Sequence, residues 1–120
     1  MANVHAALTA LVAALHVVFL VLEAFLWNTP RGRKLFGTTP ELAKEMAPLA
    51  ANQGLYNGFL AAGLAWGLVD PVAGGPVRTF FLGCVVVAGV IGAITVKRSI
   101  LFLQGVPAMA ALAAGFLARG

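Results

Sequence analysis

The stretch LHVVFLVLEAFLWN, residues 15–28, is almost unbroken hydrocarbon, yet it contains His16 and Glu23 and closes on Trp27. A carboxylate in such surroundings is costly unless another group receives it. The apolar run begins well before this stretch, and about 20 mostly apolar residues are enough to cross a bilayer as a helix. The stretch therefore predicts a membrane helix, Val4–Trp27, that carries polar side chains.

The composition of the whole chain points to the same class of protein. Hydrophobic residues make up 61% of the 120 residues and charged residues 10%, whereas a soluble domain carries about 25% charged residues. The net charge of +4 comes from bases in short connectors, which a membrane-topology signal explains better than nucleic-acid binding does. We expect residues 1–120 to form a single all-α transmembrane domain whose partner is the lipid bilayer, with no nucleic acid.

Three more apolar segments are long enough to cross a bilayer. The predicted spans are Val4–Trp27, Pro48–Val69, Val77–Val96 and Ile100–Leu117. Irregular backbone cannot face lipid, so helices are the expected form and a four-helix membrane bundle is the predicted fold. No Lys or Arg precedes the first span, so it lacks the charged region of a cleaved signal peptide and we expect it to be retained.

The basic residues predict the orientation of the spans. Six of the eight lie in the first and third connectors: Arg31, Arg33, Lys34, Lys44, Lys97 and Arg98. Only Arg78 and Arg119 fall on the opposite side. Because cytoplasmic connectors are enriched in Lys and Arg, both termini should lie outside a multi-pass protein of the inner (plasma) membrane.

The first connector contains the signals of a turn followed by a helix. Gly37 permits the turn, and either of the two threonines after it can cap a helix. We expect a short amphipathic helix, Pro40–Ala47, at the cytoplasmic interface after span one. Pro48 should then kink the chain or separate this helix from span two.

Small residues at four-residue spacing predict where helices approach closely. Span two contains two G-x-x-x-G motifs, Gly54 with Gly58 and Gly63 with Gly67. Span three has Cys84, Ala88 and Gly92 at four-residue steps, and Gly89 beside them. Packing within the bundle is the favoured interpretation. A homodimer interface, or another homo-oligomer, is the alternative.

The polar residues of span one share one face. At about 100° per residue, His16 lies about 20° from His5, Glu23 about 20° from His16, and Trp27 about 40° from Glu23. Ionisable groups in a membrane usually face the bundle interior and pair there. Trp27 is alternatively an interfacial anchor. We therefore expect polar groups on another span to pair with this face of span one.

Span two offers these partners in the segment ANQGLYNGF, which contains Asn52, Gln53, Tyr56 and Asn57. In antiparallel spans, Asn52 and Gln53 should lie at the depth of Glu23 and Trp27. Asn57 should lie nearer the midplane, close to His16. These residues predict an intramembrane polar pocket formed by spans one and two.

The sequence resembles the small bacterial and fungal membrane proteins known as domain of unknown function 1304. The resemblance rests on HVVFLVLEAFLW, ANQGLYNGFLAAGLAWG, FFLGCVVVAGVIGAITVKRSIL and QGVPA, and it covers nearly the whole chain. It implies a four-helix inner-membrane protein, with no agreed activity. It adds no cofactor, substrate or catalytic residue.

Three functions are compatible with these residues. The favoured one is binding or transport of a small ligand, an ion or a proton in the polar pocket, with Glu23 as its anchor. The second is an intramembrane enzyme or cofactor protein in which His16 and Glu23 hold a metal, although about 10 Å of helix separates them and other spans must contribute ligands. In the third, an assembly protein, the polar groups only fix helix register. No H-E-x-x-H, C-x-x-C, P-loop or G-x-S-x-G pattern is present, which favours a non-enzymatic role, and no cofactor is identified.

Overall fold

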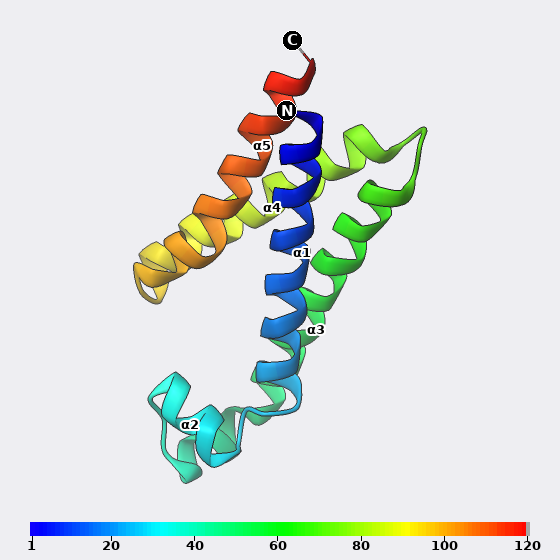
Figure 1. Ribbon diagram of the computed structural model, residues 1–120. Helices are drawn as coiled ribbons and strands as arrows, with labels where there is room; N and C mark the ends of the chain where they lie inside the picture. Colours follow the sequence, from blue (N-terminus) through cyan, green and yellow to red (C-terminus); the bar gives the residue numbers. More distant parts are fainter. Residues whose placement is uncertain (120) are drawn as a thin grey trace. The chain divides into compact units, whose positions relative to one another are not determined.

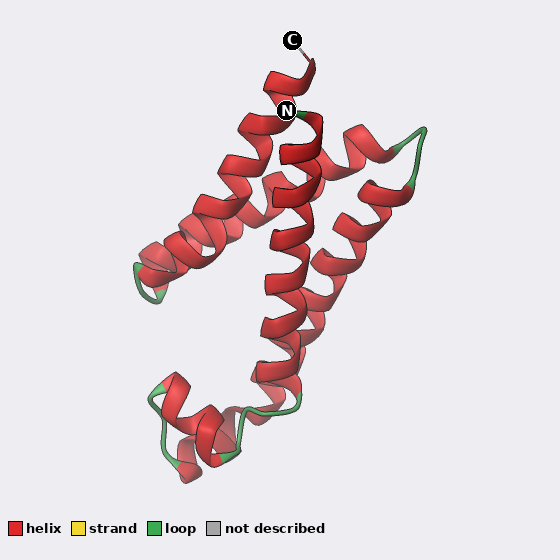
Figure 2. Cartoon of the chain, in the orientation of Figure 1, coloured by secondary structure: helices red, strands yellow, loops and turns green. Residues whose placement is uncertain are grey.

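A computed structural model describes residues 1–119, and the regular secondary structure of that range is helical (Figure 2). The helices follow in the order α1 (Ala2–Ala24), α2 (Pro30–Phe36), α3 (Pro40–Val69), α4 (Gly74–Thr95), the π-helical turn η1 (Leu101–Gly105) and α5 (Val106–Arg119) (Figure 1). The all-α prediction is confirmed. The chain divides into two compact units, Met1–Ala14 with Leu60–Gly120 (unit 1) and Leu15–Phe59 (unit 2).

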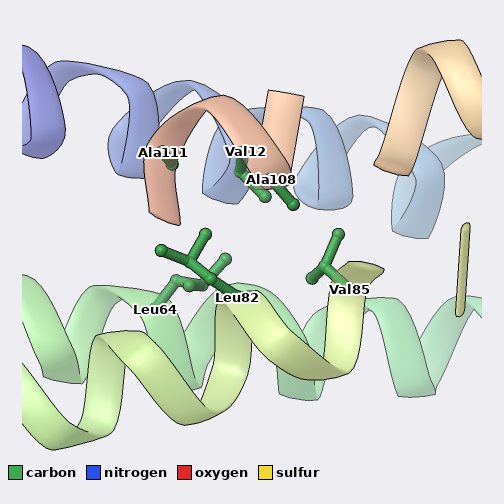
Figure 3. Packing of buried hydrophobic residues seen from close by; sticks show 6 residues of the cluster. All are labelled: Val12, Leu64, Leu82, Val85, Ala108 and Ala111. Atoms are coloured by element: carbon green, nitrogen blue, oxygen red, sulfur yellow. The ribbon is translucent and has the colours of Figure 1, made fainter. Parts of the chain in front are cut away.

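Unit 1 has a small, tightly packed apolar core (Figure 3). Leu64, Leu82 and Val85 of α3 and α4 are fully buried against small side chains of α1 and α5, namely Val12, Ala108 and Ala111. Alanine on one side leaves room for leucine on the other, so the helices interlock without large voids. Large apolar side chains such as Phe80, Ile94 and Phe102 remain exposed on the protein, as expected of surfaces that contact lipid.

In unit 1, the backbones of α4 and η1 approach each other closely. A Cβ atom added to Gly89 of α4 would lie 2.7 Å from the backbone nitrogen of Gly105. Gly105 ends η1, where the Val106 N–H bonds the Leu101 carbonyl five residues back. Pro107 follows at the second position of α5 and lacks an N–H group. We attribute the π turn to this proline, because it interrupts the regular ladder at that point.

In unit 2, a short helix, α2, precedes the position where the sequence predicted one short helix. The helix α2 was missed, although Thr29 caps it by accepting a 3.1 Å hydrogen bond from the Gly32 N–H. Gly37 ends α2 in the left-handed conformation at φ 64°, as its predicted turn requires. The Thr39 hydroxyl then accepts a 3.2 Å bond from the Leu42 N–H at the start of α3.

The expected boundary at Pro48 is absent, because α3 runs without interruption from Pro40 to Val69. The expected helix Pro40–Ala47 therefore forms the first turns of α3. A proline inside a helix removes one hydrogen bond, but the rest of a 30-residue helix supports the turn around it. Similarly, α1 ends at Ala24, a turn earlier than the predicted span.

Within residues 1–119, three helices are apolar and long enough to cross a membrane: Ala2–Ala24, Gly74–Thr95 and Leu101–Arg119. They correspond to the predicted first, third and fourth spans. The helix that contains the predicted second span, α3, does not reach the same apolarity, because Asn52, Gln53 and Asn57 interrupt its centre.

Candidate functional site

Unit 2 brings Glu23 and Asn57 together. Glu23 lies in the last turn of α1, and its Oε1 accepts a hydrogen bond from Nδ2 of Asn57 on α3. Asn57 is only 5% exposed, whereas Glu23 is half-buried. A carboxylate offers about four acceptor positions, so one amide leaves room for a further donor or a cation.

Glycines of α3 make this approach possible within unit 2. A Cβ atom at Gly54 would lie 3.1 Å from the backbone nitrogen of Ala24, and one at Gly58 would lie 3.4 Å from the Leu20 side chain. Both motif glycines therefore face α1 of the same chain. The close approach at Gly54 places the last turn of α1 beside residues 54–57 of α3.

This register differs from the depth argument made from the sequence. Asn52 and Gln53 were expected at the level of Glu23, but its hydrogen-bond partner is Asn57, another residue of the predicted pocket, about one turn further along α3. Because α1 ends at Ala24, Glu23 lies in its last turn. Asn52 and Gln53 are exposed on the protein surface.

The other predicted site residues have separate surroundings. Trp27 donates a 2.9 Å hydrogen bond from Nε1 to the carbonyl of Ala43, and its ring packs against Phe36 at 4.8 Å between centroids. These contacts anchor the connector. Tyr56 is 55% exposed, and its ring meets Phe59 edge to face.

His16 is fully buried, as expected for a polar residue that faces a helical interior. Its ring meets Phe19 edge to face at 5.2 Å. Among residues 1–119, no group of three or more His, Cys, Asp or Glu side chains is arranged to hold a metal ion.

The sequence interpretation missed a second polar cluster, which lies in unit 1. Nε of Arg78 on α4 donates a 3.0 Å hydrogen bond to Nε2 of His5, and Nδ1 of His5 bonds the Ala111 carbonyl at 2.7 Å. Sequence analysis grouped His5 with the stripe of span one and treated Arg78 as a topology residue. The sequence did contain a signal for this cluster, because Arg78 is a charged residue at the second position of the predicted third span, directly after Val77.

The fold is all-α, and three helices of the described residues 1–119 have the length and apolar composition that a membrane span needs. The model of a family described as protein of unknown function (DUF1304) matches residues 10–116, and the chain belongs to that family. The expected family is therefore confirmed. Comparison with curated proteins and with solved structures gave no match.

Proposed function

We propose that the protein is a multi-pass membrane protein that binds a small cation or a proton at Glu23, either to hold it or to pass it through the membrane. The observation that carries this proposal is the half-buried carboxylate whose hydrogen-bond partner, Asn57, is a neutral amide. Among the described residues, no Lys or Arg forms an ion pair with Glu23. A proton or a bound cation would compensate the charge of this half-buried carboxylate.

The proposed topology has four spans, with α3 crossing the membrane as well. One cavity of unit 1 is lined by Ala2 at the start of α1, Leu68 at the end of α3, Gly75 at the start of α4 and Arg119 at the end of α5. Helix ends that share one cavity lie on the same side of a bilayer. The chain must therefore cross an even number of times from the start of α1 to the end of α5, and α3 has to cross together with α1, α4 and the helix formed by η1 and α5. At about 1.5 Å per residue, the 30 residues of α3 extend about 45 Å, which is enough to cross.

By the distribution of Lys and Arg, the connectors 25–39 and 96–100 face the cytoplasm, and both termini lie outside. The inner membrane is the compartment this orientation suits. The glycine contacts described above lie within the chain and add no support for a homodimer interface.

Replacing Glu23 by Gln is expected to abolish cation or proton binding and leave the fold intact. The amide oxygen of the introduced glutamine retains an acceptor for Asn57 but carries no charge. The measurement is the electrical response of proteoliposomes on a solid-supported membrane to steps of Na⁺, K⁺, tetramethylammonium and pH. The wild type should give a transient with one of these probes, and the Glu23→Gln variant should give none.

The matched control is Glu45→Gln, an exposed carboxylate on the first turns of α3. It should leave the transient unchanged. A wild-type transient that survives Glu23→Gln would contradict the assignment of Glu23, and the absence of any wild-type response to all four probes would contradict the proposed function.

A further inference from the structure

A cavity of about 220 Å³ in unit 1 is bordered by the start of α1, at Ala2 and His5, and by the end of α5, at Ala118 and Arg119. The charged and polar residues of its lining are His5, Arg78 and Arg119. Its volume is below the roughly 300–1,000 Å³ of sites for drug-sized ligands. It therefore suits a small anion or the headgroup of a larger molecule.

Arg78 is held in a fixed position at this cavity. Its Nε donates to Nε2 of His5 at 3.0 Å, and its Nη1 donates to the Gly67 carbonyl at 2.5 Å. Because Nδ1 of His5 donates to the Ala111 carbonyl, Nε2 is the acceptor nitrogen of the ring. A guanidinium group has five N–H donors, so these two bonds orient it and leave others for a ligand.

Three glycines from three helices make the space for these two side chains. A Cβ atom at Gly67 of α3 would lie 2.6 Å from Cγ of Arg78, and one at Gly74 of α4 would lie 2.9 Å from its Nη1. A Cβ atom at Gly115 of α5 would lie 2.9 Å from the His5 ring. The positions of Arg78 and His5 are therefore built into the packing of the unit.

Arg119 adds a second guanidinium group to the rim. Its Nη2 donates to the Thr79 hydroxyl at 2.9 Å, and its guanidinium lies 5.3 Å from the centre of the Phe116 ring. Two bases from α4 and α5 thus border one small cavity. Among the residues described as lining it, none carries a carboxylate.

Asp70, in the connector between α3 and α4, is engaged elsewhere. Its Oδ1 accepts bonds from the Ala73 and Val72 N–H groups at 2.8 and 2.9 Å, and its Oδ2 accepts from Trp66. These bonds, with the one from Ala73 first, hold the pKa of the Asp70 carboxyl below its ordinary value. Asp70 therefore stabilises its own turn, and the contacts of the described residues include no ion pair between it and either arginine.

We propose that this cavity binds a phosphate group, carried either by a lipid headgroup or by a soluble phosphate. Two guanidinium groups match a tetrahedral oxyanion, since each can donate two N–H groups to its oxygens. Spans that start and end here place the cavity at the level of the lipid headgroups. The proposal does not depend on the Glu23 site, and His5 and Arg119 lie outside the range 10–116 that matches the family.

The test is isothermal titration calorimetry of the full chain, purified in a nonionic detergent, with inorganic phosphate and separately with short-chain phosphatidylglycerol. Arg119→Gln should weaken binding about tenfold, which is the loss of one charge-assisted contact. Arg119 is exposed, so its replacement spares the fold. Arg78→Gln should weaken binding at least as much, and its folding is checked by circular dichroism.

The matched control is Arg98→Gln, which removes an exposed base from the connector between α4 and η1 and should leave the affinity unchanged. Binding of inorganic phosphate identifies a soluble ligand, and binding of phosphatidylglycerol alone identifies a lipid headgroup. Either result supports the proposal if Arg119→Gln weakens it. Equal affinities for the wild type and Arg119→Gln, or no binding of either probe, would overturn it.

Discussion

Leucine in place of Gly89 is expected to lower the free energy of unfolding of the protein by about 3 kcal/mol. The added Cβ would stand 2.7 Å from the Gly105 nitrogen and 2.8 Å from its Cα. Backbone atoms cannot rotate away as a side chain can, so α4 must separate from η1 and α5. The measurement is reversible unfolding by sodium dodecyl sulfate in mixed micelles, followed by circular dichroism.

Gly83 provides the control on the same helix. A Cβ atom there would meet nothing within 4 Å. The free energy of unfolding of Gly83→Leu should therefore lie within about 0.5 kcal/mol of the wild-type value. If Gly89→Leu and Gly83→Leu were equally stable, the close packing of α4 on η1 would be wrong.

Replacing Leu82 by Ala should cost about 2–3 kcal/mol, and the reasons follow from its surroundings. Leu82 is fully buried in the core of unit 1, where it meets the small residues of α1 and α5 (Figure 3). When the helices are separated in lipid, hydrocarbon chains already surround Leu82. The replacement therefore loses little of the free energy of transfer from water that a soluble protein would lose. The loss in free energy of unfolding comes mainly from the cavity left by the shorter side chain. We therefore expect a value in the lower half of the roughly 2–5 kcal/mol seen for such replacements in soluble proteins.

Val87→Ala, on the exposed side of α4, should change the same free energy of unfolding by less than about 0.5 kcal/mol. Both variants are measured in the same titration. A loss at Val87 as large as that at Leu82 would mean that the inward face of α4 has been assigned wrongly.

The long helices of this chain could be predicted from its sequence. An apolar segment of about 20 residues that crosses a bilayer must satisfy its backbone hydrogen bonds internally, and a helix does so. The Gly37 turn was predicted for the same kind of local reason, since it needs a positive φ. The fate of Pro48 was not, because a proline weakens a helix without deciding whether the turns on either side compensate. The helix α2 is short, and its Thr29 cap and Gly37 terminus only become informative together.

The polar residues were harder to pair than to find. Helical periodicity correctly placed His5 and His16 among buried residues, but it gives direction around an axis and not the partner across it. The register between α1 and α3 within unit 2 determines the partner of Glu23, which is Asn57, about one turn further along α3 than Asn52 and Gln53. His5 joins Arg78, from a helix more than 70 residues away, through space left by glycines. No local pattern records that contact.

The four-span topology is tested most directly by labelling single cysteines from each side of the membrane, in a Cys84→Ser background. The sites are Lys34→Cys before α3, Val72→Cys after it and Ser99→Cys after α4, all at exposed positions. The reagent is a membrane-impermeant maleimide, applied to intact and to permeabilised cells. If α3 crosses, Val72→Cys is labelled in intact cells, whereas Lys34→Cys and Ser99→Cys are labelled only after permeabilisation. Labelling of Lys34→Cys and Val72→Cys from the same side would contradict the crossing of α3 and, with it, the membrane pocket at Glu23.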